Sequence, residues 1–318
     1  MKNPETTAPA SRWRDRLLMQ EDLNFLLTNR VPRLLLTRLM GRFSRIRSRW
    51  LTRLSVAVWR QFTPLDLSEA APADFDSLHA VFTRALKPGT RPVDPRPDVL
   101  VSPCDAIVGA CGAVRDGQVF QAKGMPYAMA DLFGGDPLAA DFVGGSYVTL
   151  RLTSAMYHRF HAPCDARLGD VIYLSGDTWN VNPIALARVE RLFCRNERAV
   201  LPLTLPSGAR IALVPVAAIL VASLRLHALD VRLHLRYRGP NRLPCDVPVT
   251  RGQELGWFEH GSTIIVFAPP GFRLAPGIAT GTHICMGQAL LLEPLVSAGR
   301  DGDTPLSSAA TTMDAHAP

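Results

Sequence analysis

The sequence predicts an α+β protein, in which a β-rich antiparallel body of sandwich or barrel-like form follows an amphipathic helical region. Beyond about residue 100, short apolar segments alternate with turn residues every 8 to 12 positions, which is typical of antiparallel sandwiches and barrels. Before residue 63, apolar side chains recur at spacings of three and four residues, which is the helical period. The chain has 318 residues, 47% hydrophobic and 20% charged, which suffices for a well-buried core.

The first part of the chain divides into a polar tail and a helical region. Residues 1–15 are polar and contain no apolar h-region, so we expect a disordered tail and no secretory signal. Residues 16–90 are expected to form a helical, membrane-associating region, whose pattern is clearest in VPRLLLTRLMGRFSRIRSRWLTRLSVAVWRQF. Pro32 suits the start of a helix, and Gly41 is expected to divide the segment in two.

This helical region is strongly basic. Nine arginines and no acidic residue lie between Arg30 and Arg60, within a chain of net charge +7. Such a stretch can bind an anionic membrane surface, pack on its own domain or contact nucleic acid. The membrane surface is favoured, because Trp50 and Trp59 lie on or near the apolar face opposite the arginines. Nucleic acid is not expected as a partner, because no recognised binding motif accompanies the charge.

The remainder of the chain is a β-rich domain, residues 91–296, followed by a tail. A short helix and a proline-rich extended run, from Phe75 to Pro103, lead into it. The longest apolar stretch, IALVPVAAILVASL from Ile211 to Leu224, has 14 residues and contains Pro215. It therefore predicts two buried strands and not a membrane-spanning helix. Residues 297–318 are polar and are expected to be disordered.

Three stretches concentrate reactive side chains, namely LVSPCDAIVG with Asp105, AMYHRFHAPCD with His158 and His161, and ELGWFEHGSTIIVF with Ser262. Each has an ordinary structural interpretation, since an Asp in such a turn commonly caps it and Gly-Ser-Thr is a common turn. The two histidines lack a third ligand at suitable spacing, so no metal site is expected. Together, an Asp, a His and a Ser beside β-strands can form a triad, which geometry defines and sequence order does not.

Eight motifs in order give this chain a resemblance to the phosphatidylserine decarboxylase family, over about residues 31–292. They are VPRLLLTRLMG, FTRALKPGTRPVD, VLVSPCDAIV, QAKGMPY, YHRFHAPCDARLGDVIYLSGDTWNVNP, LFCRNERAV, GQELGWFEHGSTIIVFAP and MGQAL. The pair YHRFH and GST is the most specific. The sequence departs from the family at three positions. His260 replaces the usual Leu before Gly-Ser-Thr, Cys104-Asp105-Ala106 replaces Ala-Asp-Gly, and Met156 replaces an Asp.

The resemblance implies a proenzyme that cleaves itself between Gly261 and Ser262. The β-rich domain would then be the catalytic domain, divided into a β chain of residues 1–261 and an α chain of residues 262–318. Ser262 would become a covalent pyruvoyl group, the cofactor. A Schiff base between this group and the serine headgroup would lead to phosphatidylethanolamine and CO2. The implied partners are phosphatidylserine, an anionic membrane surface and the α/β heterodimer of the cleavage products, alone or as a dimer.

The resemblance also implies roles for the reactive residues. His161, oriented by Asp105, would be the base for self-cleavage, and His158 would protonate the product carbon, although these two roles could be exchanged. His260 could be an extra acid or base, but we favour a substitution whose side chain points away. The expected location is the cytoplasmic side of the cell membrane, bound peripherally. Two alternatives remain, an intact serine hydrolase using Asp105, His161 and Ser262, and a non-catalytic membrane-binding protein.

Overall fold

The computed structural model describes residues 32–71, 74–122, 124–219, 223–229, 231–234, 237–259 and 262–294. The two tails predicted at 1–15 and 297–318 lie outside these residues, as do the helical pattern before Pro32 and the residues His260 and Gly261. The backbone of Ser262 is described, but its side chain is not.

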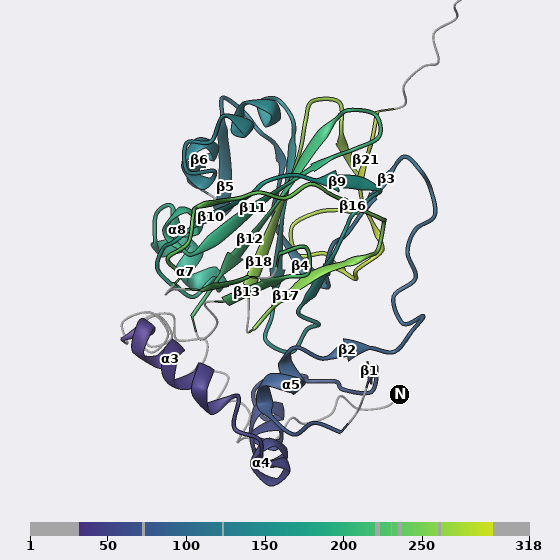
Figure 1. Ribbon diagram of the computed structural model, residues 1–318. Coiled ribbons are helices and arrows are strands. Elements are labelled where there is room, and N and C mark those ends of the chain that lie inside the picture. Colours follow the sequence, from purple (N-terminus) through teal and green to yellow (C-terminus); the bar gives the residue numbers. More distant parts are fainter. Residues whose placement is uncertain are drawn as a thin grey trace, which may run out of the picture.

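A ten-stranded antiparallel sheet forms the centre of the molecule (Figure 1). Its main path runs, in spatial order, through β15 (Arg242–Leu243), β10 (Val171–Leu174), β11 (Arg198–Thr204), β12 (Arg210–Ala217), β18 (Ser262–Ala268), β7 (Ser146–Leu152), β4 (Ala106–Ala113) and β20 (His283–Ile284). Two strands lie off this path, β9 (Ala166–Leu168), which pairs with β11, and β16 (Val247–Val249), which pairs with β9.

Four smaller sheets complete the β structure. The four-stranded sheet contains, in spatial order, β14 (Arg232–His234), β13 (Ser223–Leu226), β17 (Glu254–Phe258) and β8 (Arg159–His161). The three-stranded sheet contains β19 (Arg273–Leu274), β21 (Ala289–Leu292) and β3 (Val99–Val101). The two remaining sheets are the pairs β1 (Ala70–Ala71) with β2 (Ala85–Leu86) and β5 (Gln118–Ala122) with β6 (Met125–Ala128). The helices are α3 (Arg33–Phe43), α4 (Arg49–Arg60), α5 (Leu78–Phe82), α6 (Met129–Leu132), the 3-10 helix η1 (Pro137–Phe142), α7 (Pro183–Arg188) and α8 (Leu192–Arg195).

The central sheet is buried on both faces. On one face, Leu150 and Ile264 belong to a cluster that includes Phe160 and Phe258 of the four-stranded sheet. On the other face, Phe267 belongs to a cluster formed with residues of α6, η1, α7 and α8. Alternate residues of each strand point to opposite faces, which explains why β18 reads as a continuous apolar run.

The α+β prediction is confirmed, and two of its details need correction. The barrel-like alternative is wrong, because the path of the central sheet runs from β15 to β20 without closing within the described residues. Gly41 lies inside α3, and the helical segment breaks after Phe43 instead. A glycine costs a helix only about 1 kcal/mol, whereas Ser48 accepts a hydrogen bond from the backbone N–H of Leu51 and so starts α4.

The interpretation of the 211–224 stretch is confirmed. It contains β12 except for its first residue, Arg210, and it also contains the first two residues of β13. Pro215 is accommodated in β12, whose pairing with β11 omits Val214 and Pro215 while its pairing with β18 continues. Proline has no N–H to donate, so one side of the ladder is interrupted there.

Candidate active site

The backbone of Ser262 begins β18, in the middle of the central sheet. It pairs with Leu152 of β7 on one side and with Ala217 of β12 on the other. The ladder continues on both sides along β18, so the position of residue 262 is determined by two neighbouring strands. His260 and Gly261, the other predicted residues at this point, lie outside the described residues.

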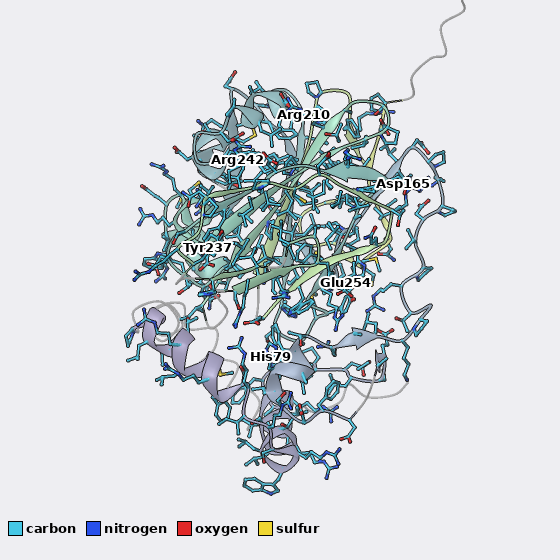
Figure 2. All side chains as sticks on the ribbon, in the orientation of Figure 1. His79, Asp165, Arg210, Tyr237, Arg242 and Glu254 are labelled. Atoms are coloured by element: carbon cyan, nitrogen blue, oxygen red, sulfur yellow. The ribbon has the colours of Figure 1, made fainter. Side chains whose placement is uncertain are left out.

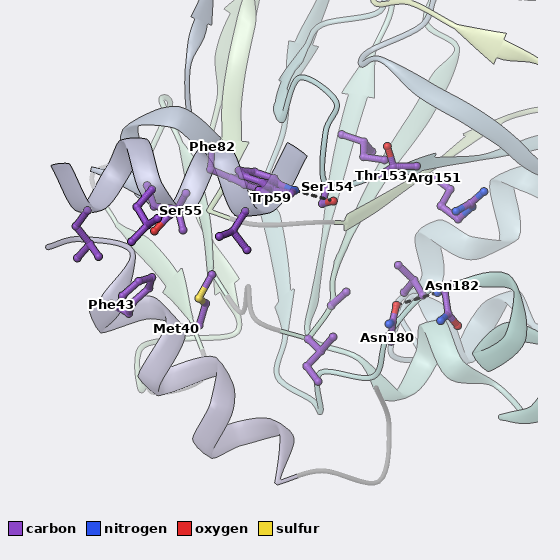
Figure 3. A pocket seen from close by; sticks show the side chains of 18 residues that line it. Met40, Phe43, Ser55, Trp59, Phe82, Arg151, Thr153, Ser154, Asn180 and Asn182 are labelled. Atoms are coloured by element: carbon purple, nitrogen blue, oxygen red, sulfur yellow. Dashed lines mark hydrogen bonds between the residues drawn. The ribbon is translucent and has the colours of Figure 1, made fainter. Parts of the chain in front are cut away.

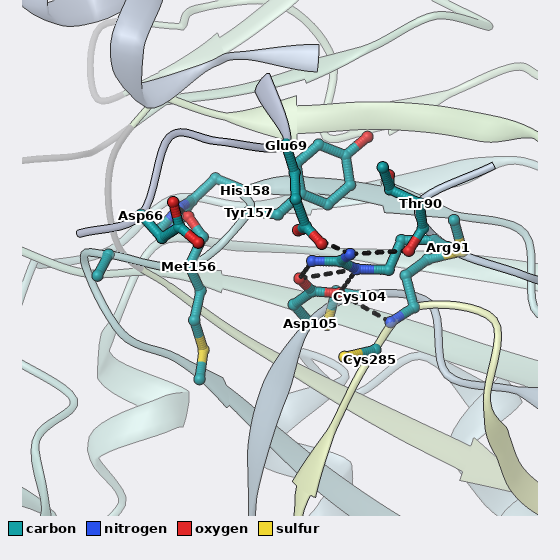
Figure 4. A network of polar contacts seen from close by, with 12 residues as sticks. Asp66, Glu69, Thr90, Arg91, Cys104, Asp105, Met156, Tyr157, His158 and Cys285 are labelled. Atoms are coloured by element: carbon teal, nitrogen blue, oxygen red, sulfur yellow. Dashed lines mark hydrogen bonds and ion pairs between the residues drawn. The ribbon is translucent and has the colours of Figure 1, made fainter. Parts of the chain in front are cut away.

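Asp105 lies in the turn between β3 and β4, and an arginine binds it. The Nε atom of Arg91 donates to both carboxylate oxygens at 2.9 and 3.1 Å, and its Nη2 atom donates to Oδ2 at 2.6 Å. The backbone N–H of Met286 donates to Oδ1 at 2.9 Å. Arg91 also pairs with Glu69 at 2.9 Å, so it bridges two carboxylates (Figure 4). The hydrogen bond to Asp105 raises the pKa of Arg91.

His161 ends β8, and both of its ring nitrogens are engaged. Its Nδ1 atom lies 2.9 Å from the carbonyl oxygen of Gly252, and its Nε2 atom lies 3.0 Å from the hydroxyl of Tyr157. A carbonyl oxygen only accepts, so the Nδ1 atom holds the proton and the neutral ring accepts the Tyr157 hydroxyl at Nε2. Burial lowers the pKa of His161, which favours this neutral form.

His158 directly precedes β8 and is fully buried. Its Nδ1 atom lies 2.8 Å from the carbonyl oxygen of Met156, and its ring lies against that of Phe82, with centroids 4.0 Å apart. Its carbonyl oxygen accepts the N–H of Phe258, at the end of β17. Ser262 follows Phe258 by four residues, so this pairing connects His158 with the segment that leads to Ser262.

The predicted site residues therefore come together only in part. The backbone N–H of His161 donates to the carbonyl oxygen of Pro103, which brings the histidine beside the turn that holds Asp105. Within the described residues, however, no hydrogen bond joins the two side chains, and Arg91 occupies the carboxylate instead. The sequence did not predict Arg91 as the partner of Asp105 or Tyr157 as the partner of His161. Both residues nevertheless lie inside motifs that carry the family resemblance, FTRALKPGTRPVD and YHRFH.

A cavity of about 770 Å³ lies at the Ser262 end of β18 (Figure 3). Both neighbours of Ser262 lead into it, since Leu152 lines the cavity and Ala218 follows Ala217. Helices α3 and α4 supply an apolar wall, and the other wall is more polar. The lining residues are Met40, Phe43, Leu51, Leu54, Ser55, Val58, Trp59, Leu78, Phe82, Arg151, Leu152, Thr153, Ser154, Asn180, Val181, Asn182, Ala218 and Ile219.

Comparison with known proteins decides the family. The model of the family "Phosphatidylserine decarboxylase" matches residues 78–292. A phosphatidylserine decarboxylase proenzyme of Pseudomonas putida (strain GB-1) is 36% identical over 277 residues, covering 83% of this chain and 95% of that protein. The chain belongs to the phosphatidylserine decarboxylase family. It is therefore an enzyme of the carboxy-lyase class.

Relatives from other genera are similar over the same extent. The phosphatidylserine decarboxylase proenzyme of Chromobacterium violaceum is 36% identical over 286 residues, which is 86% of this chain and 99% of that protein. That of Brevibacillus brevis is 34% identical over 270 residues, which is 83% of this chain and 95% of that protein. All three relatives are named proenzymes, which agrees with the resemblance found in the sequence.

The described residues around position 262 fit the pyruvoyl group that this decarboxylase family implies. A new chain end at residue 262 would be held by β7 and β12, at the end of a cavity large enough for part of a lipid. Residue 262 would hold the group covalently, so no separate cofactor pocket is required.

The helical arm, α3 with α4, exposes many apolar side chains. Its exposed large apolar side chains are Leu35, Leu39, Phe43, Ile46, Trp50, Leu54 and Val58, and Trp50 is 73% exposed. Trp59, by contrast, packs inward and stacks on Phe82, and its Nε1–H donates to the hydroxyl oxygen of Ser154 at 3.4 Å. Among the described helices, none has the length and apolar character needed to cross a bilayer.

Proposed function

We propose that the chain decarboxylates phosphatidylserine to phosphatidylethanolamine, using a pyruvoyl group that it makes by cutting itself between Gly261 and Ser262. One structural observation carries the proposal beyond the family. Residue 262 begins a central strand and lies at the end of a cavity with an apolar and a polar wall. An amphipathic substrate requires that combination, with its reacting headgroup at the polar wall.

Self-cleavage would begin with attack by the hydroxyl oxygen of Ser262 on the carbonyl carbon of Gly261. The peptide bond becomes an ester, and the nitrogen of Ser262 becomes a free amine. Loss of the Cα proton of Ser262 then expels the residue-261 carboxylate and leaves dehydroalanine, which water converts to a pyruvoyl group and ammonia. The hydroxyl needs a base, and His161 is suited to this role because its neutral form is favoured by burial.

Asp105 would act on His161 in this step through the surrounding network. Within the described residues, Asp105 binds Arg91 and makes no hydrogen bond to the His161 ring, which Tyr157 and Gly252 orient. The Asp105 carboxylate would therefore act on His161 only through its negative charge, which opposes the lowering of the histidine pKa by burial. A direct contact would require the Nδ1–H of His161 to leave the carbonyl oxygen of Gly252, because a carboxylate only accepts.

In the mature enzyme, the pyruvoyl group would supply the electron sink that makes loss of CO2 possible. The chain's own residues would bind the lipid and move protons. His158 is the proposed donor of the proton to the product carbon, since it lies behind Phe82, which lines the cavity. The roles of His158 and His161 could be exchanged.

The helical arm would hold the enzyme at an anionic membrane surface, on the cytoplasmic side. Its exposed apolar side chains would enter the interface, and its arginines other than Arg45, which binds Glu259, would attract anionic lipids at about 1 kcal/mol each. The same helices form the apolar wall of the cavity, so acyl chains could pass from the bilayer along α3 and α4 to the site. The two products of cleavage would remain together as an α/β heterodimer.

The intact mass of the purified protein, together with a denaturing gel, tests the proposal. We expect two chains that divide at residues 261/262, the smaller with a pyruvoyl end, and release of CO2 from phosphatidylserine vesicles. Ser262→Ala should remove both cleavage and activity, and activity surviving in this variant would refute the proposal. An uncut chain that reacts with a serine-directed probe would indicate a hydrolase, and an uncut, unreactive chain a non-catalytic membrane-binding protein.

A further inference from the structure

We infer that Arg151 binds the phosphodiester of the phospholipid headgroup and thereby sets the position of the lipid relative to residue 262. The inference rests on the proposed function and adds to it a specific headgroup contact.

Arg151 lies beside the proposed reacting residue. It is the penultimate residue of β7, and its Cα partner on β18 is Thr263, the residue directly after Ser262. Neighbouring strands lie about 4.8 Å apart, and directly opposed side chains share a face of the sheet. Arg151 therefore lies on the face of the sheet that Thr263 occupies, at the end of the strands where the new chain end would form, and its side chain lines the cavity there.

The guanidinium of Arg151 has no partner within the described part of the chain. No hydrogen bond or ion pair involves it there, whereas neighbouring arginines such as Arg84 and Arg159 are bound to carbonyl or carboxylate groups. Arg151 is half-buried, and burial alone lowers its pKa, with no nearby carboxylate opposing the effect. An arginine remains charged under such conditions, so an anion bound in the cavity would offset an existing cost.

The cavity wall changes from apolar to polar toward Arg151. Met40 and Phe43 of α3 lie on one side, and Arg151 lies with Asn180 and Asn182 on the other (Figure 3). A ligand that fits both walls has a hydrocarbon part and an anionic part. A phospholipid has this form, and its charged phosphate accepts the paired N–H groups of a guanidinium well.

Phosphatidylserine offers two anions to Arg151, and the phosphodiester is the better partner for turnover. An ion pair with the carboxylate would stabilise the substrate more than the transition state, in which that charge is lost as CO2, and so would slow decarboxylation. The phosphodiester keeps its charge throughout the reaction and is a few bonds from the reacting amine. Binding it positions the headgroup without opposing the chemistry.

The test measures lipid binding and not turnover, using the full chain with Ser262→Ala, which should stay uncut. Dihexanoyl phosphatidylethanolamine, which has the phosphodiester but no carboxylate, is compared by titration calorimetry with dihexanoylglycerol, which has neither. The parent chain should bind the phospholipid more tightly. Arg151→Gln should weaken phospholipid binding about tenfold to a hundredfold, leave dihexanoylglycerol binding unchanged, and be partly rescued by Arg151→Lys.

The matched control is Arg115→Gln, an exposed arginine in the β4–β5 turn, beyond the opposite end of β7 from Arg151. It should change neither affinity. The inference is overturned if Arg151→Gln leaves phospholipid binding unchanged, or if it weakens only dihexanoyl phosphatidylserine, which would assign the carboxylate. If the variant does not fold, equal binding of both dihexanoyl lipids by the parent chain would also overturn it.

Turnover of phosphatidylserine by the chain with its native Ser262 is assayed separately. Absence of turnover, with the Arg151-dependent lipid preference intact, would count against the proposed function and leave phosphodiester binding in place. Turnover without that preference would support the proposed function and count against phosphodiester binding by Arg151.

Discussion

The two histidines of the Tyr-His-Arg-Phe-His motif have different surroundings, although only two residues separate them. His161 is held by Tyr157 and by the carbonyl of Gly252, next to the turn that contains Asp105. His158 lies against Phe82, one ring away from the cavity, and pairs through its backbone with Phe258. These positions favour separate roles, with His161 in self-cleavage and His158 in turnover.

Alanine variants of the two histidines should separate the roles. We expect His161→Ala to slow self-cleavage about a hundredfold or more, because a general base contributes on that order. His158→Ala should still cleave but lose decarboxylation by a similar factor. Gel densitometry over time and a CO2-release assay provide the two measurements. The opposite pattern would show that the roles are exchanged, and an unaffected pair of variants would remove both residues from the mechanism.

Glu197 is a buried carboxyl group whose protonation should affect stability. Burial raises its pKa from 4.5 to about 7, and its Oε1 atom lies 2.7 Å from the hydroxyl of Tyr173, which also lies 3.0 Å from the carbonyl oxygen of His234. A hydroxyl has one proton to donate, so a protonated Glu197 satisfies both contacts. The folded chain thus holds a proton, between pH 4.5 and 7, that the unfolded chain has released.

The stabilising contribution of Glu197 should be complete below pH 4.5 and lost as the pH rises through about 7. The loss is roughly 3 kcal/mol by the size of the shift. Glu197→Gln should remove most of this slope, because the amide does not titrate. Urea unfolding of the uncut Ser262→Ala chain at several pH values measures it, with Glu190→Gln, an exposed residue, as the control. An unchanged slope in Glu197→Gln would refute the assignment.

At the scale of elements, the helical arm is tied to the segment that precedes the predicted cleavage site. Glu259 follows β17, is only 8% exposed and accepts hydrogen bonds from three side chains, Arg45 between α3 and α4, Arg232 of β14 and Ser223 of β13. His79 of α5 lies between the arm and the body (Figure 2), and its pKa is lowered by burial. One carboxylate thus joins the helical arm to the body.

Replacing this carboxylate should loosen both elements. Glu259→Gln leaves two arginines without their shared anion, so we expect the free energy of unfolding of the uncut chain to fall by about 1–3 kcal/mol. Self-cleavage should slow as well, because the segment after β17 loses its anchor. Asp246→Asn is the matched control, since its pair with Arg167 is exposed and contributes only about 0–1 kcal/mol. Equal effects of the two variants would contradict a special role for Glu259.

The exposed face of α4 should determine membrane affinity. Trp50→Ala is expected to weaken binding to anionic vesicles about tenfold, because a side chain that is 73% exposed in water loses its burial in the interface. Sedimentation with vesicles, at low and high salt, separates this apolar part from the electrostatic part. Phe120→Ala removes another exposed aromatic side chain and should have no effect, because its strand, β5, lies far from the arm (Figure 1). A loss equal to that of Trp50→Ala would argue against a localised binding face.

At the scale of the whole molecule, the predicted α chain is built into the fold and not attached to its surface. It would supply β18 and β20 of the central sheet and β19 and β21 of the three-stranded sheet. Phe267 of β18 packs against Phe133, Phe142 and Tyr147, all from the predicted β chain. Cutting before residue 262 therefore leaves the packing around β18 unchanged.

We accordingly expect the two chains to separate only on denaturation, so that native mass spectrometry gives the summed mass. Phe267→Ala should lower the stability of the uncut chain by about 3–5 kcal/mol, because it opens a cavity in this aromatic cluster. Val143→Ala, at a site that is 48% exposed, should change stability by less than about 0.5 kcal/mol. Dissociation of the cut wild-type chain in native buffer would refute this account of the assembly.

The sequence by itself determined the fold class, the family and the residues at which chemistry is expected. Periodicity separates helix from strand locally, which is why the helical arm and the two strands within 211–224 could be predicted. The motif around Ser262 is also local, so its place before a strand followed from its own residues.

Only the tertiary structure decided what surrounds these residues. The binding of Asp105 by Arg91, the position of Arg151 opposite Thr263 and the cavity between the helical arm and the sheet all join segments far apart in the chain. The open path of the central sheet was decided in the same way. Such contacts depend on strand order and packing, which the alternation of apolar and polar residues along one strand does not specify.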